Sequence, residues 1–343
     1  MSKKNARVGL SADLFDTNGH PMFGDTALSL FSDARVDWVV LPVTGGQLPA
    51  TAFTDYDALM IGGSKVSDKE LANESGKLRI IARSGVGYDA VDTKALTERG
   101  ILLTNTPIPV RNAVATTAMA FILALTLRLP LKSRLAKEAR WRERGNYPGL
   151  ALAGRTLGII GLGGIGRELV RLMQPFGMVI VAADPYVDAN SAAQAGAMLC
   201  SLEKLLEQSD VVVVACLLNE STRHLLNAER LRLMKPSAYL INVARGPIID
   251  EAALIEILRD GQLAGAGLDV FEKEPPDSDN PLLTMETVIP TAHCLCWTDS
   301  FVDAVARDAI SGIIAALNGH WPEYVVNPAA KAHGRVQAWV RAP

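Results

Sequence analysis

The chain has 343 residues, of which 49% are hydrophobic and 21% charged, and its formal net charge is −3. This length exceeds one average domain, so we expect two domains of an ordinary globular protein. No long basic block supports a nucleic-acid partner, and the longest apolar run, residues 113–127, is too short to span a bilayer. The 4 cysteines lack a disulfide-scaffold spacing and no signal-peptide run follows the first residues, so we expect a cytoplasmic protein.

Short apolar runs rich in β-branched residues alternate with helical patterns along the chain. In the first third, the expected strands are residues 6–11, 37–43, 58–63, 78–85 and 101–106. A long apolar helix is expected over residues 111–129, after Pro107 and Pro109. This alternation is typical of βαβ units and a parallel sheet.

The rest of the chain repeats the pattern. Strands are expected at 156–163, 178–185, 210–218, 238–244, 264–271 and 287–293, and a closing helix at 300–317. The run VVVVACLL is hydrophobic throughout, as in a central parallel strand covered on both faces. We therefore expect an α/β fold of two domains, in which residues 107–299 are inserted between the two parts of the first domain, residues 1–106 and 300–330.

The segment GLGGIG has the spacing Gly-x-Gly-x-x-Gly at Gly161, Gly163 and Gly166, between an expected strand and a helix. In a dinucleotide-binding turn the first glycine permits the tight turn, the second lets the backbone approach the pyrophosphate, and the third lets helix and strand pack closely. The helix N-terminus offers N–H groups to the phosphates. Asp184, about 20 residues further on, can bind the ribose hydroxyls, which favours NAD over NADP. The alternative is that Asp184 only caps the loop before Pro185.

Three segments that follow expected strands carry groups suited to hydride transfer at a carbon that bears oxygen. Arg245 can bind a substrate carboxylate through a forked pair of hydrogen bonds, and a histidine such as His293 suits proton transfer near neutral pH. A carboxylate, Glu272 or Glu274, can orient the imidazole. Taken singly, each has an ordinary structural alternative. Their joint placement after parallel strands favours a single site.

The chain resembles the D-isomer specific 2-hydroxyacid dehydrogenases from about residue 59 to residue 327. The resemblance rests on the segments IARSGVGYDAVD, TNTPIPVRNAVATTAMAFILAL, GRTLGIIGLGGIG, INVARGPIIDE, AGAGLDVFEKEPP and PTAH, in this order. It implies two Rossmann-like domains, a flavodoxin-like substrate domain and an inserted NAD-binding Rossmann domain, with the active site in the cleft between them. It also implies NAD as cofactor, a D-2-hydroxy acid or 2-oxo acid as substrate, and a homodimer formed through the helix at 111–129.

The resemblance further assigns roles to individual residues. The catalytic set would be Arg245, Glu274 and His293, with Glu274 preferred to Glu272 because it directly precedes Pro275. The substrate carboxylate would meet Arg245 and the backbone N–H groups of Ser84, Gly85 and Val86. The dinucleotide would be lined by Gly161, Gly163, Gly164, Ile165, Gly166, Asp184, Cys216, Leu217, Thr222, Val243, Ala244 and, at the nicotinamide carboxamide, Asp269.

The chain departs from the family pattern near His293. Ala292 replaces the usual proline, and Cys294-Leu295-Cys296-Trp297 replaces a small run, so we expect a reshaped nicotinamide pocket. A zinc site on His293, Cys294 and Cys296 lacks a fourth ligand, so we expect no metal, and a redox-sensitive thiol is the alternative. Lys65 stands in the loop where phosphoglycerate-using members carry an arginine, which disfavours a phosphorylated substrate. Two other functions stay open: a nucleotide-sensing co-repressor and a formate or phosphite dehydrogenase.

Overall fold

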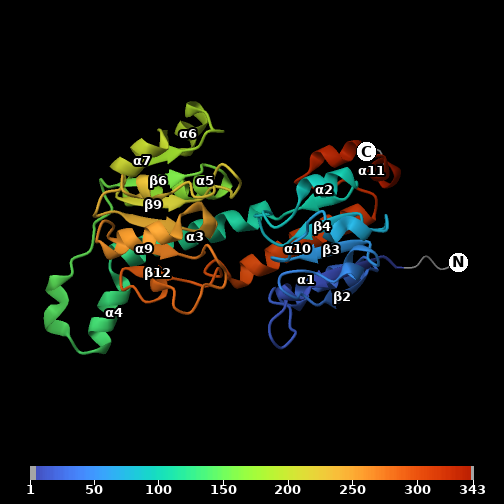
Figure 1. Ribbon diagram of the computed structural model, residues 1–343, viewed down its shortest axis with the longest axis horizontal. Coiled ribbons are helices and arrows are strands. Elements are labelled where there is room, and N and C mark those ends of the chain that lie inside the picture. Colours follow the sequence, from blue (N-terminus) through green and yellow to red (C-terminus); the bar gives the residue numbers. More distant parts are fainter. Residues whose placement is uncertain (1–4, 341–343) are drawn as a thin grey trace. The chain divides into compact units, whose positions relative to one another are not determined.

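The computed structural model describes residues 5–340. The chain divides into two compact units: residues 1–110 with 297–343, and residues 111–296. Each unit is built on one sheet whose paired strands are all parallel, with helices on both faces of the sheet (Figure 1). The expectation of an α/β fold is confirmed.

The first unit has five strands in the order β2-β1-β3-β4-β5, which is the flavodoxin-like order. The strands are β1 (Arg7–Ser11), β2 (Asp37–Leu41), β3 (Ala58–Ile61), β4 (Ile80–Arg83) and β5 (Leu102–Thr104). The α-helices are α1 (Asp25–Asp33), α2 (Thr93–Glu98), α10 (Asp299–Leu317) and α11 (Gly334–Trp339). Short 3-10 helices are η1 (Ala12–Leu14), η2 (Ala50–Phe53), η3 (Glu70–Asn73) and η8 (Pro328–Ala332).

The central strand β3 explains why this sheet carries helices on both faces. Ala58 and Met60 are buried in the hydrophobic cluster that includes side chains of α1 and α10. Leu59 and Ile61 are buried in a separate cluster with η2, η3 and α2. Successive side chains of a strand point to opposite faces, so a strand that is apolar at every position needs cover on each side.

The second unit has seven strands in the order β12-β11-β10-β9-β6-β7-β8, and the strand order reverses between β6 and β9, as in a Rossmann sheet. The strands are β6 (Thr156–Ile160), β7 (Val179–Ala183), β8 (Met198–Leu199), β9 (Val211–Val214), β10 (Tyr239–Asn242), β11 (Gly265–Leu268) and β12 (Val288–Pro290). The helices α4 (Leu129–Lys137), α5 (Gly164–Met173), α6 (Ala189–Ala195), α7 (Leu202–Gln208), α8 (Ala228–Leu231) and α9 (Glu251–Arg259) belong to it. Its 3-10 helices are η4 (Trp141–Asn146), η5 (Gln174–Phe176), η6 (Gly246–Ile248) and η7 (Pro281–Leu283).

Strand β9 is the run of valines for which the sequence predicts a position covered on both faces. It lies between β10 and β6 in the sheet. Val211 and Val213 are buried in a cluster with side chains of α5, whereas Val212 and Val214 are buried in a cluster with side chains of α7 and α9. The prediction of a central, doubly covered strand is confirmed.

The long apolar helix is α3 (Pro107–Thr126), so it begins four residues before the predicted start. Proline fits the first turn of a helix because the N–H it lacks has no partner there. At 20 residues the helix is longer than the apolar run at 113–127 and could cross a membrane by length and composition alone, a test that core helices of globular proteins also pass. Ala118, Phe121 and Ile122 are nevertheless buried in the core of the second unit, as in a core helix of a globular domain.

Candidate active site

The carboxyl ends of five strands in the second unit share one register. Ile160 of β6 pairs with Val214 of β9, and Val214 pairs with Asn242 of β10. Asn242 in turn pairs with Leu268 of β11, and Leu268 with Pro290 of β12. The segments that follow these residues therefore leave the sheet at one edge. In open α/β sheets ligands bind beyond this edge, where the strand order reverses.

The glycine turn follows β6 at this edge, and the surroundings of its three glycines are those that the predicted roles require. Gly161 has φ +96°, and a Cβ there would lie 2.8 Å from the Cys216 backbone. A Cβ at Gly166 would lie 2.2 Å from the Gly161 carbonyl oxygen, so only glycine lets α5 pack this closely. A Cβ at Gly163 would have no atom within 4 Å, which leaves room for a ligand against the backbone. The turn therefore fits a pyrophosphate at the start of α5.

Asp184 follows β7 and lies against the glycine turn. Its Oδ2 accepts a hydrogen bond from the Leu162 N–H at 2.8 Å, and its Oδ1 accepts one from the Tyr186 N–H at 2.9 Å. The second contact shows that Asp184 does cap the loop that contains Pro185. This cap does not prevent the carboxylate from also binding ribose hydroxyls. The carboxylate is partly exposed beside the turn, at the position from which an acidic residue binds the ribose hydroxyls in a Rossmann domain.

The segment after β9 contains three more of the predicted dinucleotide residues, Cys216, Leu217 and Thr222. Cys216 packs behind Gly161, and burial raises the pKa of its thiol to about 11, so this sulfur stays protonated at neutral pH. Thr222 braces the loop: its hydroxyl donates to the Leu217 carbonyl at 2.7 Å and accepts from the Asn219 N–H at 2.8 Å. Leu217 is exposed. The other predicted residues lie at the same sheet edge: Gly164 and Ile165 are in the first turn of α5, and Val243 and Ala244 follow β10.

Arg245 follows β10 in a turn that is organised by a residue which sequence reasoning missed. Asn242 is 1% exposed; its Nδ2 donates to the Arg245 carbonyl at 2.9 Å and its Oδ1 accepts from the Ala244 N–H at 3.0 Å. The Arg245 side chain donates through Nη1 to the Ala244 carbonyl at 2.7 Å. A polar residue at the end of an apolar strand was the available signal, because a buried amide needs partners.

His293 and Glu274 come together as a hydrogen-bonded pair. The His293 Nδ1 lies 2.8 Å from Glu274 Oε2. The other oxygen, Oε1, accepts from the Phe271 N–H at 3.1 Å, which fixes the carboxylate within its own loop. His293 has φ +53°, a left-handed conformation that an L residue adopts only when its surroundings hold it there. The pairing leaves Nε2 as the ring nitrogen available to a substrate.

The charge state of Glu274 follows from its surroundings. Burial raises the pKa of this carboxyl, but the hydrogen bond and charge of His293, the Phe271 N–H and the charge of Arg245 outweigh burial and hold the pKa below its usual value. The ionised form is therefore the one that the fold favours. This contribution to stability is complete above the ordinary carboxyl pKa and is lost as the pH falls through the lowered value.

Glu272, the other candidate carboxylate, is committed elsewhere. Its Oε1 lies 2.7 Å from His224 Nε2, and its Oε2 accepts from the Glu251 N–H at 3.4 Å. The structure thus brings Glu274, and not Glu272, to His293.

Asp269 is buried beneath the loop that carries His293. Its Oδ1 accepts from the Thr291 hydroxyl at 2.6 Å and from the N–H groups of Cys294 and Leu295 at 3.2 and 3.3 Å. These contacts lie on both sides of His293 in the chain. Asp269 therefore holds the histidine loop, a role that the resemblance did not assign to it.

The cysteines beside His293 differ in their surroundings. Cys294 is exposed and Cys296 is buried, and neither forms a disulfide bond. Within residues 5–340, no group of three or more His, Cys, Asp or Glu side chains is arranged to hold a metal ion.

The loop after β4 in the first unit holds the predicted substrate-binding residues, but two of its N–H groups are already used. The Ser84 N–H donates to the Ile61 carbonyl at 2.8 Å, and the Gly85 N–H donates to the Thr106 hydroxyl at 2.9 Å. The structure therefore does not support these two groups as donors to a substrate. Among the described residues, the N–H groups of Val86 and Gly87 have no acceptor, so Val86 stays a candidate and Gly87 joins it.

The second unit matches the NAD-binding domain of the D-isomer specific 2-hydroxyacid dehydrogenases over residues 119–294. The chain is also 37% identical, over 279 residues, to glyoxylate reductase of Pyrococcus furiosus, and the match spans 80% of this chain and 83% of that enzyme. The chain belongs to this dehydrogenase family. As a D-2-hydroxyacid dehydrogenase it has an NAD-binding domain, and the family match favours this class over a co-repressor or a formate or phosphite dehydrogenase.

Two further relatives are also named as dehydrogenases of 2-hydroxy acids. D-3-phosphoglycerate dehydrogenase of Methanocaldococcus jannaschii is 38% identical over 275 residues, which span 80% of this chain and 52% of that enzyme. The chain thus spans about half the length of that relative. A solved structure of D-lactate dehydrogenase from Aquifex aeolicus, complexed with NAD and lactic acid, has a TM-score of 0.81 at 25% identity and covers 93% of this chain and 99% of its own.

Proposed function

We propose that this chain uses NAD to interconvert a D-2-hydroxy acid and the corresponding 2-oxo acid. The observation that carries the proposal is the His293–Glu274 pair, which follows β11 and β12 at the sheet edge that also holds the glycine turn and the Arg245 turn. When bound, NAD supplies the hydride acceptor, or the hydride donor in the reverse direction. The fit of this cofactor rests on the open backbone at Gly163 and on Asp184 beside the turn.

The side chains of this unit then have distinct roles. In oxidation, His293 removes the hydroxyl proton through Nε2, while Glu274 holds Nδ1 and stabilises the positive charge that the ring gains. In reduction, the protonated ring returns that proton. Arg245 binds the substrate carboxylate with a forked pair of hydrogen bonds, which lysine cannot form.

We assign the two units different tasks. Residues 1–106 with 300–330, which lie within the first unit, would be the substrate domain and would add the N–H groups of Val86 and Gly87 as donors to the substrate. Residues 107–299 would be the NAD-binding domain. Its cofactor-binding residues would be Gly161, Gly163, Gly164, Ile165, Gly166, Asp184, Cys216, Leu217, Thr222, Val243, Ala244 and Asp269.

A screen of small 2-oxo acids with NADH and NADPH tests this function through the loss of reduced-nicotinamide absorbance. The similarity to glyoxylate reductases supports a short 2-oxo acid such as glyoxylate, and we expect phosphorylated acids to be poorer substrates. Turnover of no 2-oxo acid with either nucleotide would contradict the proposal.

We expect Asp184→Asn to weaken the preference for NADH. A carboxylate beside the ribose binds its hydroxyls and repels a 2′-phosphate, and a hydrogen bond to a charged group contributes about 1.5–3 kcal/mol. The ratio of the NADPH and NADH dissociation constants should therefore fall roughly 10- to 100-fold. Fluorescence titration with each nucleotide measures this ratio. Asp188→Asn, which changes the N-cap of α6, is the matched control, and an unchanged ratio in Asp184→Asn would refute the assignment.

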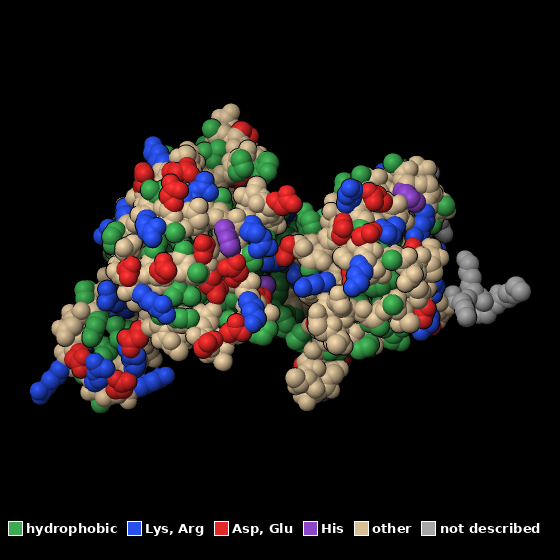
Figure 2. All heavy atoms as spheres, viewed as in Figure 1, with side chains coloured by type: hydrophobic (Ala, Val, Ile, Leu, Met, Phe, Trp, Pro, Cys, Tyr) green, Lys and Arg blue, Asp and Glu red, His purple; other side chains and the backbone are tan. Residues whose placement is uncertain are grey.

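We also propose a homodimer, with its contact at the C-terminal end of the helix predicted at 111–129 and on α4 and η4, which follow it. Leu127, Leu129 and Trp141 are 51%, 58% and 63% exposed. Exposed large apolar side chains that lie together usually meet a partner, and tryptophan is enriched at interface centres. The two elements extend away from the second sheet, and Lys and Arg side chains gather around them (Figures 1 and 2).

The segment that carries these side chains is locally basic. Between residues 128 and 144 the basic residues are Arg128, Lys132, Arg134, Lys137, Arg140, Arg142 and Arg144, against only Glu138 and Glu143. Arg134 pairs with Glu286 in the same unit, so part of this charge is neutralised locally.

Light scattering tests the dimer. We expect a mass of about twice the 36.7 kDa of one chain, and a shift toward the single-chain mass in a Leu129→Glu/Trp141→Glu variant, because charges in an apolar contact are costly. A single-chain mass for the unmodified protein at micromolar concentration would contradict the dimer. None of the 4 cysteines forms a disulfide bond, which supports our proposal of a cytoplasmic location, and cell fractionation checks it.

A further inference from the structure

A second histidine of this unit is paired with a glutamate from the segment that carries Glu274. His224 Nε2 lies 2.7 Å from Glu272 Oε1. His224 is not among the predicted catalytic residues, and Glu272 is the candidate carboxylate that does not contact His293. His224 has φ +48°, which is left-handed backbone and is unfavourable for an L residue. Such a conformation persists where surrounding contacts over-determine it. The contacts of His224 therefore indicate what it holds in place.

The backbone and the side chain of His224 contact two different catalytic segments. Its N–H donates to the Pro247 carbonyl at 2.8 Å, two residues after Arg245. Its imidazole bonds Glu272, two residues before Glu274. One residue thus bridges the Arg245 turn and the Glu274 loop.

Glu272 is in turn locked to Glu251, the first residue of α9. The Glu272 N–H donates to Glu251 Oε2 at 2.9 Å, and the Glu251 N–H donates to Glu272 Oε2 at 3.4 Å. Asn280 Nδ2 donates to Glu251 Oε1 at 2.7 Å, and His224 occupies the remaining oxygen, Glu272 Oε1. Two neighbouring carboxylates repel each other unless donors satisfy their oxygens. His224 is the donor that completes the set.

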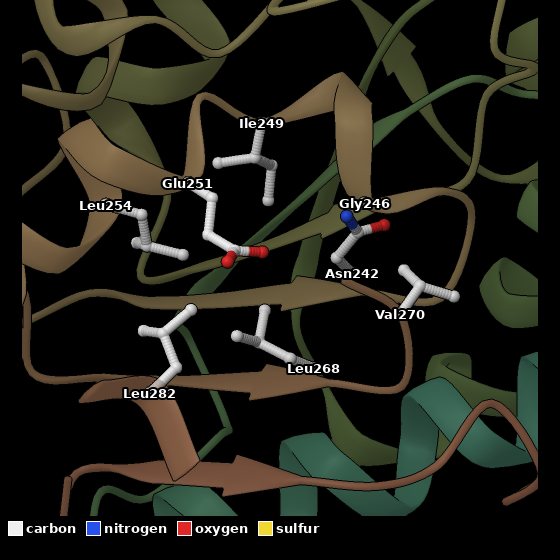
Figure 3. A pocket seen from close by; sticks show the side chains of 8 residues that line it. All are labelled: Asn242, Gly246, Ile249, Glu251, Leu254, Leu268, Val270 and Leu282. Atoms are coloured by element: carbon white, nitrogen blue, oxygen red, sulfur yellow. The ribbon is translucent and has the colours of Figure 1, made fainter. Parts of the chain in front are cut away.

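The Arg245 turn packs directly on this set. A Cβ at Gly246 would lie 1.9 Å from the Phe271 carbonyl oxygen and 2.3 Å from the Glu272 nitrogen. Figure 3 shows the Glu251 carboxylate among the apolar side chains that line an adjacent pocket, together with Asn242 and Gly246. The cavity offers about 10 Å³, enough for one water molecule and too little for an organic ligand. We therefore look for the effect of these hydrogen bonds in the two segments that they hold, the Arg245 turn and the Glu274 loop.

From these contacts we propose that His224 is a positioning residue, which sets Arg245 and Glu274 relative to each other without touching the substrate. The proposal rests on the proposed function, because Arg245 and Glu274 act together only in that reaction. A misplacement of a catalytic group by about 1 Å can lower the rate on the order of 100-fold.

Two variants separate positioning from proton transfer. His224→Asn suits the left-handed backbone, but its side chain is too short to reach Glu272. We expect it to lower kcat for 2-oxo acid reduction about 10- to 100-fold, with NADH affinity nearly unchanged. His224→Gln keeps an N–H donor of suitable reach and should recover most of the lost kcat. An unchanged kcat in His224→Asn would overturn the proposal, and so would equal losses in the two variants, because an amide cannot replace a proton-transferring imidazole.

A double-mutant cycle shows whether His224 acts through Glu274. If it does, His224→Asn should lower kcat much less in a Glu274→Gln background than in the unmodified protein. If the fold-loss of kcat in the double variant equals the product of the fold-losses in the two single variants, the proposal is contradicted. His20→Asn is the matched control, because His20 pairs only with Asp16 in an exposed ion pair. An unmodified protein that reduces no 2-oxo acid contradicts the proposed function, whereas an active protein that His224→Asn leaves unchanged contradicts only this inference.

Discussion

The variant His293→Asn is expected to lower kcat for 2-oxo acid reduction by about 10²- to 10⁴-fold, the range that a general acid–base group contributes. Asparagine keeps the left-handed backbone of this position accessible, so the loss reports chemistry rather than misfolding. NADH affinity should stay within about twofold, because the glycine turn and Asp184 are unchanged. Steady-state kinetics and fluorescence titration of NADH measure the two quantities.

The control for this variant is His320→Asn, since His320 is an exposed histidine in the first unit. It should behave as the unmodified protein. Near-normal turnover in His293→Asn would show that another group moves the proton. A parallel loss of NADH binding would mean that the substitution disturbs the cofactor site instead.

The variant Arg245→Gln is expected to raise KM for the 2-oxo acid and to lower kcat/KM by about 10²- to 10³-fold. Truncating one partner of a buried, hydrogen-bonded charge pair costs about 2–5 kcal/mol, and the guanidinium is proposed to pair with the substrate carboxylate. Arg245→Lys should recover only part of this loss, because an ammonium restores the charge but not the forked geometry. Initial-rate kinetics over a range of substrate concentrations separates KM from kcat.

Arg230→Gln serves as the matched control, since Arg230 contacts Glu203 and the Leu225 carbonyl near the surface of the same unit. Its kcat/KM should be close to normal. If Arg245→Gln leaves KM unchanged and lowers only kcat, Arg245 does not hold the substrate carboxylate in the ground state.

The periodicity of the sequence predicts the sheets well because their central strands are covered on both faces. The run at Val211–Val214 is apolar at every position, and the two faces of β9 account for all four side chains. The site edge is predictable for a related reason. Parallel strands end at one edge, so residues that follow them, such as His293 and Arg245, converge without any local signal that links them.

Other features depend on contacts that no local pattern reveals. The Gly85 N–H is satisfied by the hydroxyl of Thr106, 21 residues away in the chain, so the loop sequence alone overstates the number of free donors. The bridge from His224 to Glu272 spans 48 residues. In the sequence, Asp269 and Asn242 are ordinary polar residues at strand ends. Only the structure shows that their side chains hold the loops at Thr291 and Arg245.

The different roles of Glu272 and Glu274 also depend on contacts that no local sequence pattern reveals. Both residues precede the Pro-Pro pair and have the same chemistry, so composition cannot separate them. The backbone of the 271–274 loop turns one carboxylate toward His293 and the other toward His224 and Glu251. Their roles therefore follow from the path of the loop and not from residue type.

The most direct test of the account follows the hydride itself. The unmodified protein is incubated with NADH deuterated at the C4 position, each stereoisomer of the label in turn, and with a 2-oxo acid that it reduces in the screen and whose reduced product is chiral. The product is analysed by mass spectrometry and chiral chromatography. We predict a D-2-hydroxy acid that carries deuterium at C2 with one of the two stereoisomers of the label. A product without deuterium at C2 with either stereoisomer, or an L-configured product, would contradict the proposed hydride transfer.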